Sequence, residues 1–257
     1  MEDGKNQTRI ALLDEIRGFC VFAMIIYHGV IVFGTFFGLG WANYLLAGLT
    51  PLEPPFAAMF ILICGISSKL SRSNVKRGFK LVGLALVFSL LTVGLFPKIG
   101  ITGAEDRFGI LHLLGLCILL FALLEKPLSK LSPPVGVTVF SLLYLLCYGI
   151  PAGFLGLPGP LSLSLPASLY EGNGLFWLGF MNPDTFYSAD YFPLLPNLFL
   201  FLAGTYLGIY AKDGLFPTWM YPKRVAPLDW LGTHALLLYL LHVPVLYGLA
   251  YLICNLL

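Results

Sequence analysis

An arginine and a histidine stand eleven positions apart in an otherwise apolar stretch, RGFCVFAMIIYHGVIV, residues 17–32. Eleven residues are close to three turns of an α-helix, so Arg17 and His28 would share a helix face, with His28 roughly 16 Å further along the axis. A neutral imidazole can accept a proton near pH 7, because its ordinary pKa is about 6.5. A guanidinium group binds anionic oxygens. His28 is therefore a candidate base, and Arg17 is a candidate anion-binding residue.

Other ionisable side chains also lie within or beside apolar segments. They are Glu53, Arg107, His112, Asp190 and His242. An Arg, Lys or Asp costs roughly 2.5 to 3.5 kcal/mol at the centre of a membrane helix, so such residues usually face the interior of a helix bundle and mark a functional pathway. Convergence of several of them predicts a polar site inside the bundle.

Four of these residues also have ordinary structural explanations. His242 could bond a backbone carbonyl that a nearby proline leaves without its helical donor. His112 could be a neutral core histidine, and Arg107 could be an interfacial anchor beside the acidic residues that precede it. Asp190 could be the N-cap of the helix that follows it, a position where aspartate is common. The sequence leaves both explanations open.

The composition predicts the kind of elements that carry these residues. Of 257 residues, 58% are hydrophobic and only 11% are charged, and the mean hydropathy is +0.86, whereas soluble domains are about a quarter charged. Strand-like alternation is absent, so we expect a single all-α membrane domain, residues 1–257, built as a bundle of about seven helices. The predicted spans are residues 10–36, 41–68, 77–97, 107–125, 133–150, 192–211 and 228–256. The second contains PLEPPF, which predicts a kink or break.

The distribution of basic residues predicts the orientation of the bundle. With the N-terminus in the cytoplasm, only Lys98 and Arg107 of the fifteen basic residues fall on the outer side. The positive-inside rule therefore predicts N-terminus in and C-terminus out. The long connection 151–190 would lie outside and has no Lys or Arg. It either covers the bundle at the membrane surface or forms a lid over an outward-facing pocket.

Cysteines and small residues contribute little to the functional prediction. The cysteines lie inside or at the ends of apolar segments without metal-site spacing, so we expect packing roles, no disulfides and no metal. Gly204 and Gly208 form a G-x-x-x-G pattern, which permits close helix packing within the bundle or in a homodimer. The five cysteines are Cys20, Cys64, Cys117, Cys147 and Cys254.

Several segments resemble a known family of membrane enzymes. LDEIRGFCVFAMIIYH resembles the first helix of transmembrane acyltransferases, which share an Arg, ten intervening residues and a His. FILICGISSKLSRSNVKRGFKL, DRFGILHLLGLCILL, DYFPLLPNLFLFLAGTYLG and WLGTHALLLYLLHVPVL are similar, in this order, to the bacterial branch of the heparan-alpha-glucosaminide N-acetyltransferase catalytic-domain family. The resemblance covers nearly the whole chain except the 151–189 loop.

The resemblance implies an acetyltransferase of the bacterial cytoplasmic membrane. Acetyl-CoA would be the co-substrate on the cytoplasmic side, and the acceptor would be an amine or hydroxyl of a sugar or related molecule outside, with no nucleic acid involved. His28 would be the base and Arg107 an oxyanion donor, while Glu53 would hold the acceptor. The remaining acceptor contacts would be Asp190, His242 and His112. The candidates for binding the phosphates of coenzyme A are Arg17, Lys69, Arg72, Lys76 and Arg77.

Alternatives remain open at this stage. The inner basic residues could serve only topology and contacts with anionic lipids. In the animal lysosomal members the histidine associated with catalysis lies in the first outer loop, but residues 29–50 contain none, so His28 would act from within its helix. Direct ternary transfer and a covalent acyl-enzyme are both possible. The chain could also be a transporter of a small polar solute, with a buried His and acidic relay, or a non-catalytic binding relative.

Overall fold

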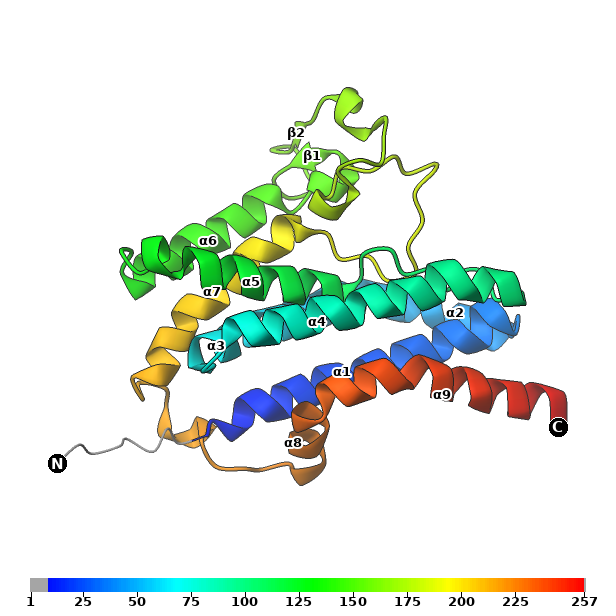
Figure 1. The fold of residues 1–257 in the computed structure, drawn as a ribbon, viewed down its shortest axis with the longest axis horizontal. Coiled ribbons are helices and arrows are strands. Elements are labelled where there is room, and N and C mark those ends of the chain that lie inside the picture. Colours follow the sequence, from blue (N-terminus) through cyan, green and yellow to red (C-terminus); the bar gives the residue numbers. More distant parts are fainter. Residues whose placement is uncertain (1–8, 257) are drawn as a thin grey trace. The chain divides into compact units, whose positions relative to one another are not determined.

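The computed structural model describes residues 9–256, and it bears out the all-α prediction (Figure 1). Among these residues, seven helical segments are long and apolar enough to cross a membrane. The chain is therefore an integral, multi-pass membrane protein, as predicted. The seven segments are Ala11–Phe36, Gly40–Leu70, Asn74–Ile99, Ile110–Leu128, Pro133–Ala152, Leu194–Lys212 and Ala235–Cys254.

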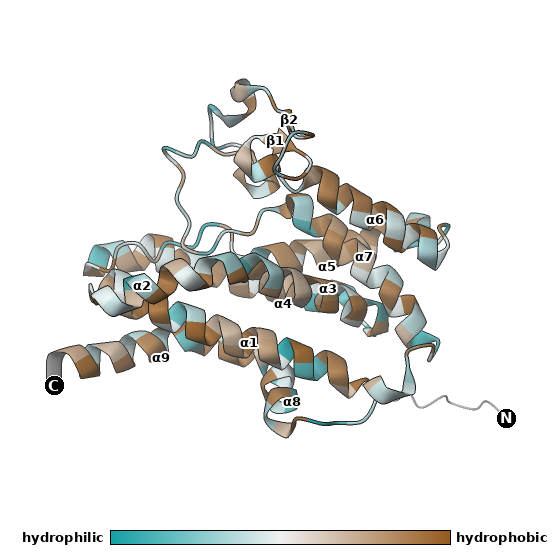
Figure 2. Ribbon diagram, turned by 180° about the vertical axis from the view of Figure 1, so that it is seen from behind, coloured by the Kyte–Doolittle hydropathy of each residue, from teal (hydrophilic) through white to brown (hydrophobic). Residues whose placement is uncertain are grey.

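The described residues divide into two compact units. The first unit contains the residues up to Ile63 and those from Gly214 onward, and the second contains Cys64–Asp213. A single domain was expected over the chain, and that organisation stays a prediction. Figure 2 shows hydrophobic residues along much of α6 (Pro133–Cys147) in the second unit and α9 (Ala235–Leu256) in the first.

The first unit begins with α1 (Ala11–Ile31), which continues as a π-helical stretch to Phe36. The predicted break in the second span is confirmed. The chain leaves α2 (Gly40–Leu49), passes through a 3-10 turn (Thr50–Leu52) and enters α3 (Glu53–Leu70). Two prolines follow Glu53 directly, where the first turn of a helix has no carbonyl partner for its N–H groups, so proline costs little there.

The seventh predicted span, 228–256, is wrong at its start. Its first residues belong to a separate helix, α8 (Ala226–Thr233), and the long helix α9 begins only at Ala235. His234 separates the two with φ −102° and ψ 14°, outside helical values.

Two glycines explain why α8 leaves the direction of α9. A Cβ atom on Gly18 of α1 would lie 1.9 Å from the carbonyl oxygen of Leu228, and one on Gly232 of α8 would lie 1.8 Å from that of Asp14. The backbones of α1 and α8 therefore touch directly, which only residues without a Cβ allow. The glycine of the LDEIRG segment thus has a packing role.

The second unit contains four long helices. They are α4 (Asn74–Ser89, continued by a π-helical stretch and a 3-10 turn to Ile99), α5 (Ile110–Leu128), α6 and α7 (Leu194–Lys212). Phe140 of α6 stacks on Tyr206 of α7, with ring centroids 5.6 Å apart. A Cβ on Gly208 would lie 2.7 Å from the carbonyl oxygen of Ile66. Gly208 therefore packs inside the protein, and a homodimer stays a prediction.

The 151–190 connection folds into short elements. Strands β1 (Phe154–Leu155) and β2 (Leu163–Ser164) pair in antiparallel register, and 3-10 turns follow. The hydroxyl of Tyr191 donates to the carbonyl of Phe176 at 2.7 Å, and Phe176 and Phe186 pack with ring centroids 5.3 Å apart. The end of the loop and Tyr191 therefore form a small, partly exposed aromatic cluster.

Candidate active site

His28 of α1 and His242 of α9 form a close pair in the first unit. Nδ1 of His28 lies 2.6 Å from Nε2 of His242, and the rings stack with centroids 4.8 Å apart and planes 13° apart. His242 is 6% exposed. The two histidines are 214 positions apart in sequence. Packing of α9 on α1 therefore creates the pair.

The hydrogen-bond network assigns the protons on both rings. Nδ1 of His242 lies 2.6 Å from the carbonyl oxygen of Tyr239, and a carbonyl only accepts, so Nδ1 carries the hydrogen. In the neutral ring Nε2 of His242 is then an acceptor. His28 must donate from Nδ1, which leaves its Nε2 as an unprotonated lone pair. This is the arrangement of a base that a second group orients.

Glu53 contacts Tyr27, the residue directly before His28 in α1. The hydroxyl of Tyr27 donates to Oε2 of Glu53 at 3.1 Å, and the rings of Tyr27 and His28 have centroids 5.8 Å apart. A hydrogen bond to a charged acceptor is stronger than one between neutral groups, so it holds the carboxylate in place. The start of α3 thus places an acidic group near the histidine pair.

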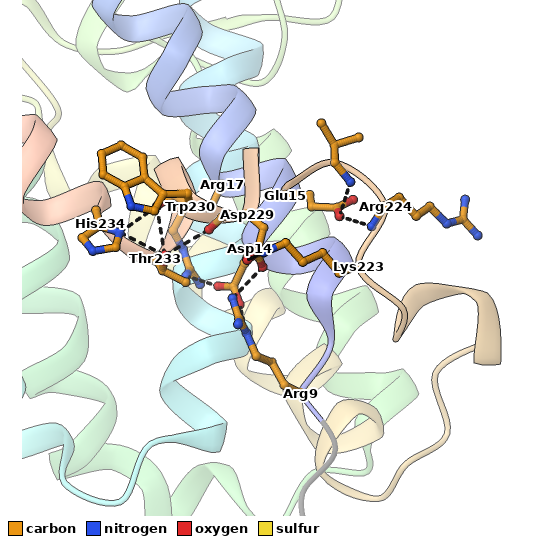
Figure 3. Close-up of polar contacts among 11 residues, drawn as sticks. Arg9, Asp14, Glu15, Arg17, Lys223, Arg224, Asp229, Trp230, Thr233 and His234 are labelled. Carbon is orange, nitrogen blue, oxygen red and sulfur yellow. Dashed lines mark hydrogen bonds and ion pairs between the residues drawn. The ribbon is translucent and has the colours of Figure 1, made fainter. Parts of the chain in front are cut away.

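Arg17 belongs to an ionic cluster that joins α1 to α8 (Figure 3). Its Nη1 donates to Asp14 at 2.7 Å, and Asp14 also accepts from Arg9 at 2.8 Å. Asp229 of α8 pairs with Arg9 at 2.6 Å and with Lys223 at 2.8 Å. The bond from Lys223 lowers the pKa of Asp229, with a further contribution from Arg9, while Asp14 raises the pKa of Arg9.

Glu15 is the buried member of the same region. It is 5% exposed, and its Oε1 accepts the backbone N–H groups of Arg224 and Val225 at 2.6 and 2.8 Å (Figure 3). These amides lie directly before α8, where helix N–H groups have no intrahelical partner. Glu15 therefore fixes the start of α8 from α1.

The predicted phosphate-binding residues between α3 and α4 differ in their surroundings. Lys69 pairs with Glu125 at 2.8 Å, and Nη2 of Arg77 lies 3.3 Å from Sγ of Cys64. The side chains of Arg72 and Lys76 are exposed. These two cations are therefore the most accessible of the predicted set for an anionic ligand.

Arg107 was predicted to lie at the start of the fourth span, but it precedes the helix. α5 begins at Ile110, because Phe108 pairs with Tyr191 in a parallel bridge and Gly109 is extended, with φ −89° and ψ −172°. The Arg107 side chain is exposed, and its Nε donates to the carbonyl of Tyr187 at 3.1 Å. It thus contacts the 151–190 loop rather than a helix turn.

Asp190 and His112 meet at the start of α5. One structural explanation for Asp190 was that it caps the helix that follows it, but that helix has no side-chain cap. Instead, Oδ2 of Asp190 accepts the N–H of Ile110 at 3.2 Å. Asp190 therefore caps α5. His112 accepts the N–H of Gly109 at Nδ1, 3.2 Å away, and its Nε2 lies 3.3 Å from Oγ of Ser89. His112 is 8% exposed and bonded on both nitrogens, as the core-histidine explanation requires.

Within the first unit, the structure brings three of the predicted residues together. His28 and His242 touch, and Glu53 lies next to them through Tyr27, a residue that sequence reasoning did not select. Its signal was an aromatic residue with a polar tip directly before the histidine. Among residues 9–256, no three His, Cys, Asp or Glu side chains are grouped as a metal site requires.

One comparison with known proteins gives a match. A family model described as "Heparan-alpha-glucosaminide N-acetyltransferase, catalytic" matches residues 9–244, a range that includes both histidines of the pair. No curated protein and no solved structure gives a match. The match covers most of the chain and confirms the resemblance of its segments. The chain therefore belongs to the heparan-alpha-glucosaminide N-acetyltransferase catalytic family of membrane acetyltransferases.

Proposed function

We propose that the protein moves an acetyl group from cytoplasmic acetyl-CoA to an amine or hydroxyl of a sugar or related acceptor on the outer side of the bacterial cytoplasmic membrane. Family membership supports the acetyl transfer. The excess of basic residues on one side supports the sidedness. The histidine pair is the observation that carries the proposal, because it provides an oriented base inside a membrane protein.

His28 is the proposed base. The acceptor nitrogen or oxygen attacks the thioester carbonyl carbon, and His28 Nε2 takes the proton that this atom loses. The carbon–sulfur bond of the tetrahedral intermediate then breaks, and the leaving thiolate takes the proton back from the imidazolium. One C–N or C–O bond forms, one C–S bond breaks, and the base is regenerated. No covalent acyl-enzyme is needed for this sequence.

His242 is proposed as a positioning residue. Its bonds to Tyr239 and His28 occupy both ring nitrogens, so it fixes the tautomer of His28 and favours the imidazolium that forms during transfer. The role is comparable to that of the third group in a catalytic triad. The sequence-based role, direct contact with the acceptor, fits these bonds less well.

Glu53 is proposed to hold the acceptor amine or hydroxyl, since Tyr27 fixes its carboxylate next to the histidine pair. Arg72 and Lys76 are proposed to bind the phosphates of coenzyme A, because both side chains are exposed and such cations bind phosphoryl oxygens well. We assign Arg17 and Glu15 to the assembly of α8 on α1.

The test is acetyl transfer by the purified protein in lipid nanodiscs, with radiolabelled acetyl-CoA and a panel of amino sugars. His28→Ala is expected to lower kcat by about 10² to 10⁴-fold, the usual contribution of a general base. His242→Gln is expected to lower kcat while KM for the acceptor stays the same, and to change the pH profile. His234→Ala is the matched control, because His234 is exposed and bonds only near its own turn among the described residues.

Three outcomes would overturn the proposal. Full activity of His28→Ala would remove the base. Proton-coupled uptake of a solute into vesicles without labelled product would indicate a transporter. Binding of coenzyme A without turnover, over the whole acceptor panel, would indicate a non-catalytic relative.

A further inference from the structure

Two carboxyl groups meet at the N-terminus of α5, in the second unit. A Cβ atom on Gly109 would lie 2.5 Å from Oδ2 of Asp106 and 2.7 Å from Oδ2 of Asp190. Both carboxyl groups therefore surround one point, which the missing side chain of Gly109 leaves open. Asp106 comes from the segment before α5, and Asp190 comes from the end of the outer loop.

Asp106 has an incomplete set of hydrogen bonds for an ionised group. It is 3% exposed, and among the described residues its Oδ1 is buried without a hydrogen-bond partner. A buried carboxylate oxygen without a donor is costly. A proton on Asp106 removes this cost, because the acid O–H can donate to the neighbouring carboxylate of Asp190. Two carboxyl groups that share a site commonly hold one proton in this way.

The charges around the pair favour the same state. Burial, and secondly the charge of Asp190, raises the pKa of Asp106 to about 8. The backbone N–H groups of Gly109 and Phe108 lower the pKa of Asp106, but burial and the charge of Asp190 outweigh them. Arg107 is exposed, and its Nε donates to the carbonyl of Tyr187. The other ionisable groups near the pair are Glu105, Arg107, His112 and Tyr187.

The pair lies where the outer loop is fastened to α5. The N–H of Ala189 donates to the carbonyl of Glu105 at 2.8 Å, and the N–H of Phe192 donates to that of Phe108 at 3.1 Å. Asp190 itself accepts from Ile110. Residues 187–192 therefore lie along residues 103–110 like an added strand, and the two aspartates lie within this paired stretch.

We propose that Asp106 and Asp190 form a carboxylic acid–carboxylate pair that holds one proton near neutral pH, and that this shared proton fastens residues 187–192 to the start of α5. Opening of the loop exposes both carboxyl groups to solvent, where Asp106 loses its proton more readily than in the fastened state. The connection between residues 187–192 and α5 therefore weakens as the pH rises toward the pKa of the fastened pair. The site is thus a proton-dependent latch on the loop.

The sign of the pH dependence follows from proton binding. The fastened state keeps the proton up to about pH 8, whereas the opened, solvated Asp106 loses it near its ordinary pKa of 3.8. The contact between residues 187–192 and the start of α5 is therefore most stable below pH 4 and loses stability as the pH rises to 8. Above pH 8 its stability no longer changes. Exchange protection of residues 187–192 should fall by up to about tenfold per pH unit within this window.

Hydrogen–deuterium exchange of the full protein in detergent tests the latch, with rates corrected for the intrinsic effect of pH. Wild-type protection of residues 187–192 is expected to fall more than tenfold between pH 5 and pH 8 and then level off. Asp106→Asn cannot ionise, so its protection should not vary with pH. Glu171→Gln, at an exposed acid of the 151–190 loop, is the matched control and should keep the wild-type dependence. A pH-dependent Asp106→Asn, or a pH-independent Glu171→Gln, would overturn the proposal.

A second measurement needs no variant. Infrared spectra of the wild-type protein at pH 7 should contain the carbonyl band of a protonated carboxylic acid, and the band should shift on labelling with carbon-13 aspartate and vanish by pH 9.5. Absence of an aspartate-sensitive band at pH 7 would contradict the shared proton, even if Asp106→Asn failed to fold.

Discussion

The imidazole of His28 has its orientation from a hydrogen bond as well as from its helix. α1 carries the ring, but the contact with His242 decides which nitrogen carries the proton. A fixed tautomer keeps the proton-accepting nitrogen of the base available. The pair therefore concentrates the proposed chemistry on one atom, Nε2 of His28.

The sequence indicated both histidines as candidates but not their contact. Each is an ionisable residue in an apolar run, which is a local signal. Their 2.6 Å contact depends on the rotation and register of α1 against α9, and side-chain period alone does not determine these. For the same reason the contact of Asp190 with the start of α5 was not predicted, and capping of the following helix was the structural alternative considered for it. Local patterns predicted the residue types but not partners distant in sequence.

Glu15 allows a stability prediction at the residue scale. Glu15→Ala removes the acceptor of two backbone N–H groups, those of Arg224 and Val225, and is expected to destabilise the protein by about 2 to 4 kcal/mol. Glu15→Gln keeps an oxygen acceptor, so its loss should be smaller. The measurement is the unfolding midpoint in one detergent, by heat or denaturant.

Glu171→Ala is the control, because Glu171 is an exposed acid in the outer loop. It should change stability by less than about 0.5 kcal/mol, as surface substitutions usually do. Equal losses for Glu15→Ala and Glu171→Ala would contradict the role of Glu15 at the start of α8.

At the scale of elements, the segment LDEIRG acts as a docking surface for α8. Asp14 and Arg17 belong to the ionic cluster, Glu15 holds the residues before α8, and Gly18 lets the backbones touch. The segment was selected for its charged residues and its resemblance to acyltransferases. Its observed contacts are with α8, so much of its chemistry serves assembly of the first unit.

Gly18→Ala tests this assembly. The added Cβ would lie 1.9 Å from the carbonyl oxygen of Leu228, so α8 must move away from α1, at an expected cost of about 3 kcal/mol. Gly48→Ala is the matched control in the same unit, because a Cβ there meets nothing within 4 Å. It should be neutral or stabilising by up to about 1 kcal/mol, since alanine favours helix. If both variants unfold at the same temperature, the close α1–α8 contact is contradicted.

Helix existence was predictable from the sequence, whereas helix ends were less so. Seven apolar runs gave seven segments, because a membrane core requires about 20 apolar residues with all backbone groups bonded internally. The errors lie at the helix starts near Arg107 and His234, where contacts with other segments decide where the helix begins. Extended pairing of residues 107–109 with the outer loop decides the first, and packing of α8 on α1 decides the second.

At the scale of the whole molecule, the basic residues give the chain its predicted direction in the membrane. Thirteen of the fifteen lie on the side assigned to the cytoplasm, and the long outer loop, residues 151–190, has none. The proposed division of labour, with coenzyme A inside and the acceptor outside, depends on this direction. The orientation is therefore the prediction on which the sidedness of the reaction depends.

Two serine-to-cysteine variants test the orientation with the same probe. Ser73 lies between α3 and α4, on the predicted inner side, and Ser162 lies in the outer loop; both are exposed. In a Cys254→Ser background, a membrane-impermeant maleimide added to intact cells should label Ser162→Cys but not Ser73→Cys, because charged reagents do not cross the bilayer core. Permeabilised cells should label both, which controls for reactivity. Labelling of Ser73→Cys alone in intact cells would reverse the orientation and, with it, the side on which acetyl-CoA must bind.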